Sequence, residues 1–231
     1  MLQLKDKKLK IFFYFFLFIF LSTQITKKQK IVNFFDIRIN DIQVYGLSDE
    51  KNLEVLNSLK SLLFKNIFFV NKQSFVDILN QNNLIESFDI KKSYPNKILV
   101  EIKKTNFLAI TNKNEDKYYI GSNGKLISIN KIKNFNKKLP FVFGKGNYNE
   151  FVKLKKIIDK SNFQFEEIES FYYFPSSRWD FKTNKGMLIK LPKKNILESL
   201  QFADLIKTKV QFKNNKIIDL RNSNRIIATN E

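Results

Sequence analysis

A run of eleven apolar residues, 11–21, constrains what this 231-residue chain can fold into more than any other feature. No charged residue follows the run until Lys27. A helix over residues 11–25 would be about 22 Å long, which is short for a bilayer hydrocarbon core of about 30 Å. Lys10 before the run and Lys27 and Lys28 after it can reach the headgroups and cover part of this mismatch. The run therefore indicates a short membrane span.

Two other interpretations of the run fit less well. A helix packed on a protein core keeps a polar face on its solvent side. The six phenylalanines of this run lie around the whole circumference of the helix and leave it no polar face. A cleaved signal peptide needs small residues in an A-x-A-like pattern, which Ser-Thr-Gln-Ile-Thr at residues 22–26 does not supply. We therefore expect an uncleaved signal anchor over residues 11–26, with a cytoplasmic tail over 1–10 and a juxtamembrane linker over 27–36.

The charges that flank the anchor leave its orientation nearly tied. The lysines concerned are Lys5, Lys7, Lys8 and Lys10 before the run, and Lys27, Lys28 and Lys30 after it. The positive-inside rule counts such residues on each side and here finds little difference. The short N-terminal tail favours an inward N-terminus, with the long C-terminal part translocated.

The formal net charge of +19 has three explanations. The chain is rich in Lys, Asn, Ile and Phe, as an AT-rich genome produces, and its lysines are spread over the whole sequence. Compositional bias with a solvated surface is therefore the favoured explanation, ahead of anionic lipid headgroups and of nucleic acid. We expect no nucleic-acid partner.

The absent residues exclude whole classes of chemistry. Without Cys the chain has no disulfide, thiol nucleophile or cysteine-based metal site, and without His it has no Ser-His-Asp triad or histidine-ligated zinc. Carboxylate, Ser–Lys or oxygen-ligated metal chemistry remains open.

The segment after the anchor predicts a domain with the order strand, helix, helix, strand, strand. Alternating apolar residues lead to Gly46, which permits a turn, and Ser48 and Asp49 offer N-cap oxygens for a first helix. Leu53, Leu56, Leu59 and Leu63 give that helix its apolar side. Ser74 and Asp77 resemble a capping box that opens the second helix, and two strands over 85–94 and 97–103 meet at a turn around Pro95.

The remainder predicts a second domain with more strands. Strands are expected over 107–112, 117–120, 125–130, 167–174, 178–183, 187–191 and 216–221, and helices over 149–160 and 194–207. Residues 139–143 (LPFVF) form an apolar run before Gly144. Gly124 and Gly144 mark turns in this part. The fold class is therefore α+β, with domains over 37–105 and 106–225 and a C-terminal tail over 226–231.

No motif in these domains indicates catalysis. Residues 144–146 (GKG) lack the spacing of a phosphate loop, so a structural turn is the better interpretation. Glu166, Glu167 and Glu169 have no second acidic cluster to work with, and a solvated strand edge explains them. Ser176 and Ser177 lack the Ser-Met context of membrane signal peptidases. We therefore expect no catalytic residues, no metal, no cofactor and no small-molecule substrate.

Six short motifs, taken in order, resemble the FtsQ/DivIB family of bitopic bacterial division proteins. They are residues 42–47 (IQVYGL), 94–102 (YPNKILVEI), 119–124 (YIGSNG), 139–144 (LPFVFG), Arg178-Trp179 and 218–221 (IDLR). The chain departs from the family at Gly121, where Asp is usual, and at Asn222, where an aromatic residue is frequent. It also lacks a later Trp found in some members.

The resemblance implies a POTRA domain (β-α-α-β-β) followed by a mixed α/β "β domain", with a curved antiparallel sheet and flanking helices. It further implies a type II inner-membrane protein with a periplasmic bulk, enriched at the division septum. Its implied role is a non-enzymatic scaffold of the divisome that binds the bitopic proteins FtsB and FtsL and links early to late septal assembly. Inner-membrane lipid is the other expected contact.

The final strand is the expected partner site. A terminal strand is often a sheet edge, whose free N–H and C=O groups a partner strand can extend. We expect residues 216–221 to be that edge, and Arg178, Arg221 and Arg225 to pair with partner carboxylates. The full predicted partner-binding set is Arg178, Trp179, Lys216, Ile217, Ile218, Asp219, Leu220, Arg221, Asn222 and Arg225. Solvated arginines without a partner remain an alternative.

Two other functions stay open. POTRA domains also serve outer-membrane assembly and secretion, although those chains usually carry several such units or a β-barrel. An anchored peptidoglycan-cleaving enzyme is the second alternative. Trp179 is open between a core anchor and an interface anchor.

Overall fold

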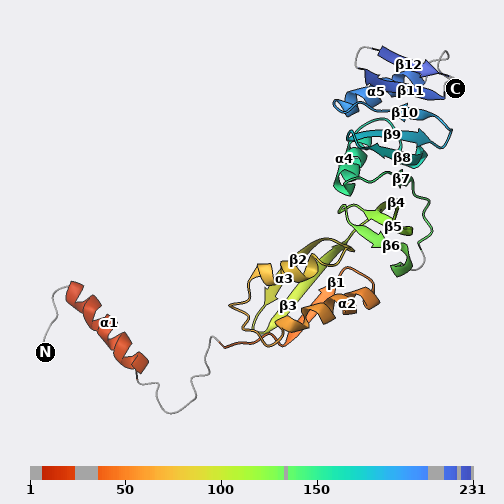
Figure 1. Ribbon diagram of the computed structural model, residues 1–231. Helices are drawn as coiled ribbons and strands as arrows, with labels where there is room; N and C mark the ends of the chain where they lie inside the picture. The colour runs from red at the N-terminus through yellow and green to blue at the C-terminus, as the bar shows by residue number, and fades with distance from the viewer. Residues whose placement is uncertain (1–6, 24–35, 133–134, 208–215, 223–224, 230–231) are drawn as a thin grey trace, which may run out of the picture.

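The computed structural model describes residues 7–23, 36–132, 135–207, 216–222 and 225–229. Residues 1–6 of the predicted tail, 24–26 of the predicted anchor, 27–35 of the predicted linker and 230–231 of the C-terminal tail lie outside this part. Three units follow one another along the chain in Figure 1: helix α1, a first domain with three strands, and a second domain with nine.

Helix α1 covers Lys7–Thr23 and includes the whole apolar run. Its side chains, where described, are exposed, and none contributes to a hydrophobic core. Among the described residues, no helix combines the length and the apolar character required to cross a membrane.

The first domain has the predicted order of elements. It consists of β1 (Asp41–Tyr45), α2 (Asp49–Leu59), α3 (Lys72–Leu79), β2 (Ile85–Ser93) and β3 (Lys97–Lys104). The sheet order is β1-β3-β2, with β1 parallel and β2 antiparallel to β3. A separate hydrophobic core, which includes Ile98, Val100 and Phe75, lies between the sheet and the two helices.

The helices of this domain differ in detail from the sequence prediction. Leu59 is buried as predicted and Leu56 and Leu63 pack against the core, whereas Leu53 is 58% exposed and Val55 is the buried residue four positions before Leu59. Asn71, not Ser74, caps α3, because its side-chain oxygen accepts the backbone N–H of Ser74 at 2.9 Å. The predicted capping box is therefore wrong, although the helix it announced is present.

The predicted turn at Gly46 is required by the close approach of two strands. Gly46 has φ +110°, and a Cβ atom there would lie 1.8 Å from the carbonyl oxygen of Ile102. Only glycine fits both the dihedral angle and the space. Pro95 lies in the turn between β2 and β3, as expected, and Gly124 and Gly144 occupy turns with positive φ.

The second domain contains nine strands, two α-helices and two short 3-10 helices within its described residues, the latter being η2 (Ile129–Lys131) and η3 (Phe165–Glu167). The strands and α-helices follow in chain order. These are β4 (Phe107–Lys113), β5 (Asp116–Gly121), β6 (Leu126–Ser128), β7 (Phe141–Phe143), α4 (Tyr148–Ile158), β8 (Ile168–Phe174), β9 (Arg178–Thr183), β10 (Leu188–Lys190), α5 (Ile196–Lys207), β11 (Ile217–Asn222) and β12 (Arg225–Thr229). The sheet order is β12-β11-β10-β9-β8-β7-β4-β5-β6. Three strand pairs are parallel, namely β4·β7, β7·β8 and β10·β11, so the predicted antiparallel sheet is in fact mixed.

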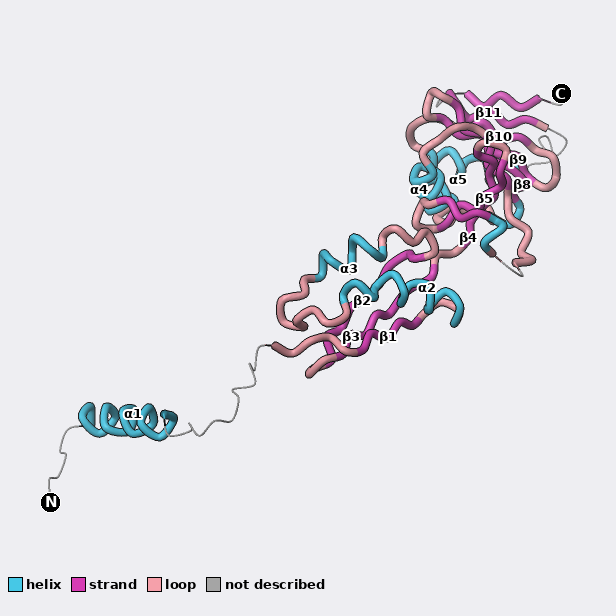
Figure 2. The backbone as a smooth tube through the Cα atoms, turned by 60° about the horizontal axis from the view of Figure 1, so that its bottom comes forward, coloured by secondary structure: helices cyan, strands magenta, loops and turns pink. Residues whose placement is uncertain are grey.

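Helices α4 and α5 cover one face of this sheet (Figure 2). Their buried residues, which include Phe151, Leu154 and Leu200, pack on inward strand residues such as Phe171 and Phe181. Side chains alternate along a strand, and among the described residues no helix covers the opposite face of β8 to β11.

The C-terminal prediction needs two corrections. The tail predicted over 226–231 is wrong in its described part, because Arg225–Thr229 forms strand β12. The expected edge strand over 216–221 is also wrong, because β11 pairs with β10 on one side and with β12 on the other. The edge strand at this end of the described sheet is β12, and β6 lies at the other end.

The two domains join through side-chain hydrogen bonds in addition to the direct passage from β3 to β4. Asn123 donates to the carbonyl oxygens of Asn83 and Ile85 at 2.9 and 2.8 Å, and Asn83 donates to that of Leu126 at 2.8 Å. Lys125 reaches the carbonyl of Asn80 at 2.6 Å. The turn after β5 is thereby fastened to the first domain.

Candidate interaction surface

The face of the large sheet away from α4 and α5 carries the most distinctive side chains of the second domain. On β9, Trp179 and Phe181 are buried against the helices, so Arg178, Asp180 and Lys182 face the other way. We call this side of β7 to β12 the open face. Its described residues are Phe141, Phe143, Tyr172, Phe174, Arg178, Asp180, Lys182, Leu188, Lys190, Ile217, Asp219, Arg221 and Ile227.

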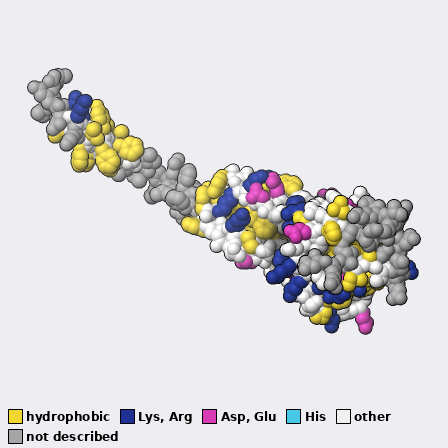
Figure 3. Space-filling model, turned by 90° about the horizontal axis from the view of Figure 1, so that it is seen from above, with side chains coloured by type: hydrophobic (Ala, Val, Ile, Leu, Met, Phe, Trp, Pro, Cys, Tyr) yellow, Lys and Arg dark blue, Asp and Glu magenta, His cyan; other side chains and the backbone are white. Residues whose placement is uncertain are grey.

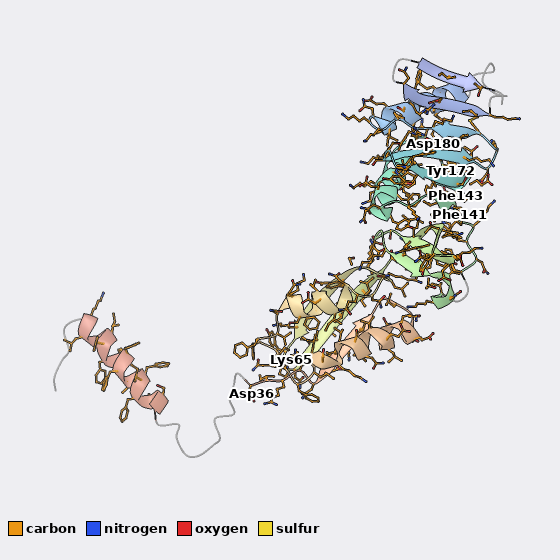
Figure 4. The ribbon with its side chains drawn as sticks, viewed as in Figure 1. Asp36, Lys65, Phe141, Phe143, Tyr172 and Asp180 are labelled. Carbon is orange, nitrogen blue, oxygen red and sulfur yellow. The ribbon has the colours of Figure 1, made fainter. Side chains whose placement is uncertain are left out.

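Aromatic rings occupy the β7–β8 part of the open face. The centroids of Phe141 and Phe143 are 4.5 Å apart, and Phe143 stacks on Tyr172 at 5.2 Å. Figure 4 shows these three residues and Asp180 on successive strands β7, β8 and β9. Phe143 remains 45% exposed, which gives this part of the face an accessible apolar surface.

A shallow groove of about 560 Å³ lies beside the rings, over β8 to β11. Its floor is apolar at Leu188 and Ile217. The cationic side chains of Arg178, Lys182, Lys190, Lys216 and Arg221 line it, and Asp180 is the one carboxylate among the lining residues that the structure describes. The groove is therefore suited to an acidic segment that also carries apolar residues.

Arg178 and Asp180 form the first ion pair of the groove. The Arg178 Nε atom lies 3.3 Å from Asp180 Oδ1, and its guanidinium lies 4.4 Å from the centroid of the Phe174 ring. Asp180 is almost fully buried, and this desolvation raises the pKa of its carboxyl above the ordinary range, although Arg178 opposes the shift.

Asp219 and Arg221 form the second ion pair. The Nε atom of Arg221 donates to both carboxylate oxygens of Asp219 at 2.8 and 2.9 Å, and the Arg221 backbone N–H donates to Oδ1 at 3.0 Å. These hydrogen bonds lower the pKa of Asp219 and raise that of Arg221. Arg178 and Arg221 each pair with an aspartate of their own strand, and the expectation that they bind partner carboxylates stays a prediction.

Strand β12 forms the border of the open face. It pairs with β11 through Ile217, Ile218 and Asp219, and within the described residues no strand pairs with its outer side. The carbonyl of Thr229 accepts the N–H of Lys216 at 2.9 Å, so the peptide groups of the preceding residue, Ala228, point outward. Ile227 is 55% exposed beside this edge.

The predicted partner-binding residues separate into two groups. Trp179, Ile218 and Leu220 are buried in the core, Asp219 is buried in its ion pair, and Trp179 packs against Tyr173 with ring centroids 4.7 Å apart. Lys216, Arg221 and Asn222 are exposed, Arg178 and Ile217 are half-buried, and the side chain of Arg225 lies outside the described residues. Of the predicted set, Arg178, Lys216, Ile217 and Arg221 therefore lie together at the groove of the open face. The apolar residues Trp179, Ile218 and Leu220 lie in the core instead.

Sequence reasoning missed Asp180, Tyr172, Phe143, Lys190 and Ile227. The available signal was the alternation of residues 178–182 around Trp179, which places Asp180 and Lys182 on the same side as Arg178. Pairing across strands, which aligns Tyr172 with Asp180 and Lys190 with Asp219, could not be read from the sequence.

No metal centre emerges from the residues that the structure describes, since they contain no group of three or more acidic side chains placed to hold an ion. Glu169 of the acidic cluster pairs with Lys182 at 3.2 Å, and Gly144, in the GKG segment, lies in a tight turn against the Tyr173 carbonyl.

Comparison with known proteins places these features in a family context. Residues 37–104 match the family described as "POTRA domain, FtsQ-type", and residues 109–221 match "Cell division protein FtsQ/DivIB, C-terminal". The chain is 29% identical over 175 residues to "Cell division protein FtsQ" of Rickettsia bellii, a match that covers 75% of this chain and 64% of that protein.

One solved structure is also similar in part. It is the major extracytoplasmic domain of the trans isomer of the division protein DivIB from Geobacillus stearothermophilus, with 12% identity and a TM-score of 0.34. The match covers 47% of this chain and 96% of that one.

Proposed function

Because the chain belongs to the FtsQ/DivIB family of cell division proteins, we propose that it is a non-enzymatic scaffold of the division complex that binds small bitopic partners. The partners proposed are FtsB and FtsL, and the role proposed is to link early and late steps of septal assembly. The binding surface proposed is the outer side of β12 together with the groove of the open face.

The edge of β12 is the observation that carries this proposal. A partner strand that pairs with β12 would extend a nine-stranded sheet and use peptide groups that point away from β11. Side chains of that partner strand would alternate between the open face and the helix side. Arg178, Arg221 and Lys182 pair with Asp180, Asp219 and Glu169, so the excess positive charge of the groove is that of Lys190 and Lys216. This excess favours acidic residues on the side of the partner strand that meets the open face, and Ile227 with Ile217 favours apolar ones.

Membrane anchoring through α1 is part of the same proposal. The support is the apolar run within Lys7–Thr23, whose described side chains are exposed and contribute to no core. We propose that this segment is the signal anchor, with the N-terminus in the cytoplasm and both domains in the periplasm, concentrated at the septum. An inward-facing reporter at residue 231 would contradict this orientation.

The edge is tested by Ala228→Pro, which removes an outward N–H and adds a ring where a partner backbone would pair. Ala228→Ser keeps the N–H and is the matched control. The full-length proteins are expressed in cells and the co-purifying FtsB and FtsL are quantified. We expect Ala228→Pro to lose most of both partners and Ala228→Ser to retain them, with unchanged melting curves for both variants.

Equal recovery of the partners with Ala228→Pro and Ala228→Ser would contradict strand addition at β12. Hydrolysis of purified cell wall by the isolated protein would contradict the non-enzymatic role, whatever the pull-down gives.

A further inference from the structure

The first domain exposes large aromatic side chains at one end. Phe64, Phe68, Phe69 and Tyr94 are 68%, 43%, 78% and 58% exposed, and Phe68 stacks on Tyr94 with ring centroids 5.3 Å apart. We call these four residues the aromatic tip. Their rings lie on the surface of a domain whose core is complete without them. Scattered single apolar residues are ordinary on a surface, whereas four exposed aromatic rings on two neighbouring segments indicate a binding surface.

The aromatic tip is built from two segments that meet beside the start of the domain. The N–H groups of Phe64 and Ile67 donate to the carbonyls of Ile39 and Ile37, each at 2.9 Å, and the N–H of Asn40 donates to the carbonyl of Asn96 at 2.9 Å. The loop before α3 and the turn between β2 and β3 therefore both flank residues 36–40. Figure 4 shows Asp36 and Lys65 at this same end.

The distance along the chain to α1 is short. Twelve residues, 24–35, separate Thr23 from Asp36. At about 3.5 Å per residue, thirteen Cα–Cα steps reach at most about 45 Å, so an anchored α1 confines the aromatic tip to the neighbourhood of the bilayer.

Phe64 provides a separate argument from its backbone. Its φ of +62° lies in the left-handed region, which is uncommon for a bulky residue. The ring is 68% exposed, so burial within the domain does not offset this conformation. A strained residue that presents an apolar ring to the exterior is typical of a binding site.

Charges around the aromatic tip have one predominant sign. Residues 60–72 contain Lys60, Lys65 and Lys72 and no acidic residue. The acidic side chains at this end are compensated, since Asp36 pairs with Arg38 at 3.3 Å and Asp41 with Lys97 at 3.4 Å. Figure 3 shows hydrophobic side chains with Lys and Arg beside them where the first domain meets the grey chain that leads to α1.

Aromatic rings next to lysines are the composition of a membrane–water interface. Rings with an apolar body settle among the headgroups, and lysine stems extend to anionic phosphates. The attraction of one lysine to anionic headgroups is weak, so it is the three lysines together that contribute to binding.

We propose that the aromatic tip is a second membrane contact, in which Phe64, Phe68 and Phe69 enter the interface and Lys60, Lys65 and Lys72 bind anionic phospholipid headgroups. This inference rests on the proposed anchoring by α1. It adds a function to the first domain: the contact fixes the angle at which the domain stands on the bilayer and hence the height of the β12 edge above it.

The test uses the full chain reconstituted in phosphatidylglycerol vesicles whose acyl chains carry bromine, which quenches nearby tryptophan. Phe69→Trp reports on the aromatic tip, and Phe202→Trp, on the exposed side of α5, is the matched control. Trp179 is buried and gives both variants the same background. We expect several-fold stronger quenching for Phe69→Trp than for Phe202→Trp.

Charge is tested by combining Phe69→Trp with Lys60→Gln, Lys65→Gln and Lys72→Gln. We expect the quenching to fall to the level of the control and to fall similarly for Phe69→Trp alone in neutral phosphatidylcholine. Protein that stays with the vesicles after alkaline carbonate is anchored. If such protein shows equal quenching for Phe69→Trp and Phe202→Trp, the proposed contact of the aromatic tip is overturned and the anchor is not. Release of the protein by carbonate would instead overturn the anchor, and the inference with it.

Discussion

At the scale of single residues, Asp180 and Asp219 illustrate how similar ion pairs differ in their consequences. Both carboxylates lie on the open face with an arginine two residues away on the same strand. Burial dominates at Asp180 and raises its pKa, whereas the hydrogen bonds from Arg221 dominate at Asp219 and lower its pKa. The sign of each shift fixes how each residue affects stability as the pH changes.

The first prediction concerns this opposite pH dependence. A lowered folded pKa means that Asp219 stabilises the fold above its unfolded pKa, of about 3.9, and that this contribution is lost as the pH falls through the folded pKa. Asp219→Asn should therefore reduce the free energy of unfolding by about 1–2 kcal/mol near neutral pH, and the difference should shrink in acid.

Asp180→Asn is the comparison. Its raised pKa means that the charged form is disfavoured in the folded state, so ionisation weakens the fold as the pH rises through the unfolded and folded pKa values. We expect Asp180→Asn to be less destabilising than Asp219→Asn at neutral pH. Urea unfolding at about pH 7 and about pH 3 measures both variants, and the same pH profile for the two would contradict the assignment.

The second prediction contrasts two glycines with positive φ. Gly46→Ala places a Cβ 1.8 Å from the Ile102 carbonyl oxygen, whereas a Cβ at Gly186 meets nothing within 4 Å. We expect Gly186→Ala to lose only the conformational term of about 1–2 kcal/mol, and Gly46→Ala to lose clearly more. Thermal unfolding of both variants measures the difference, and equal losses would show that the close approach has no energetic weight.

At the scale of elements, helix caps and strand ends were the hardest features to predict. Ser48 has the side chain of a good N-cap, yet it makes no capping hydrogen bond, and the α3 cap is Asn71. Strand β12 was missed because polar residues interrupt the chain at 222–225 and conceal the short apolar sequence that follows. The position of a helix cap and the start of a strand both depend on where the backbone turns, and residue type alone does not determine the position of a turn.

The third prediction therefore compares two caps. Asn71→Ala removes the acceptor of the Ser74 N–H and should lower the free energy of unfolding by about 1 kcal/mol. Ser48→Ala removes no such bond at α2 and should change it by less than about 0.5 kcal/mol. Chemical denaturation of the two variants gives the comparison, and a larger loss at Ser48 would reverse the assignment of the caps.

At the scale of the whole molecule, the hydrogen bonds between the domains determine how the β12 edge is presented. Asn123, Asn83 and Lys125 all bond across the junction to backbone carbonyls. Such bonds restrain the relative orientation of the domains, which an ordinary peptide connection would leave free.

The fourth prediction is that Asn123→Ala broadens the distribution of distances between the domains. The chain contains no cysteine, so cysteines introduced at Leu53 and Lys145, both exposed, accept spin labels without background. Asn184→Ala is the control, because that side chain donates to the Glu166 carbonyl within the second domain. Pulsed electron spin resonance should show a wider distribution for Asn123→Ala alone, and an unchanged one would mean that other contacts fix the orientation.

Much of the architecture was available from the sequence by itself. The period of apolar residues located most strands of both domains, as at Ile98 and Val100, and the helices of the second, as at Phe151 and Leu154, because burial of one face imposes that period. Gly46 and Gly144 marked turns, because both have positive φ and a Cβ atom at either position would collide with a backbone carbonyl. The order of motifs identified the family, and the apolar run identified the segment proposed as an anchor.

Tertiary structure alone decided what the surface presents. Strand order made β11 an inner strand and β12 the edge, because pairing partners are set by the sheet and leave no mark in a local pattern. The same pairing gathered Phe143, Tyr172 and Lys190 on one face. Loops distant in sequence formed the aromatic tip. A sequence specifies which residues must be buried, whereas the contacts between distant segments decide which exposed residues lie together.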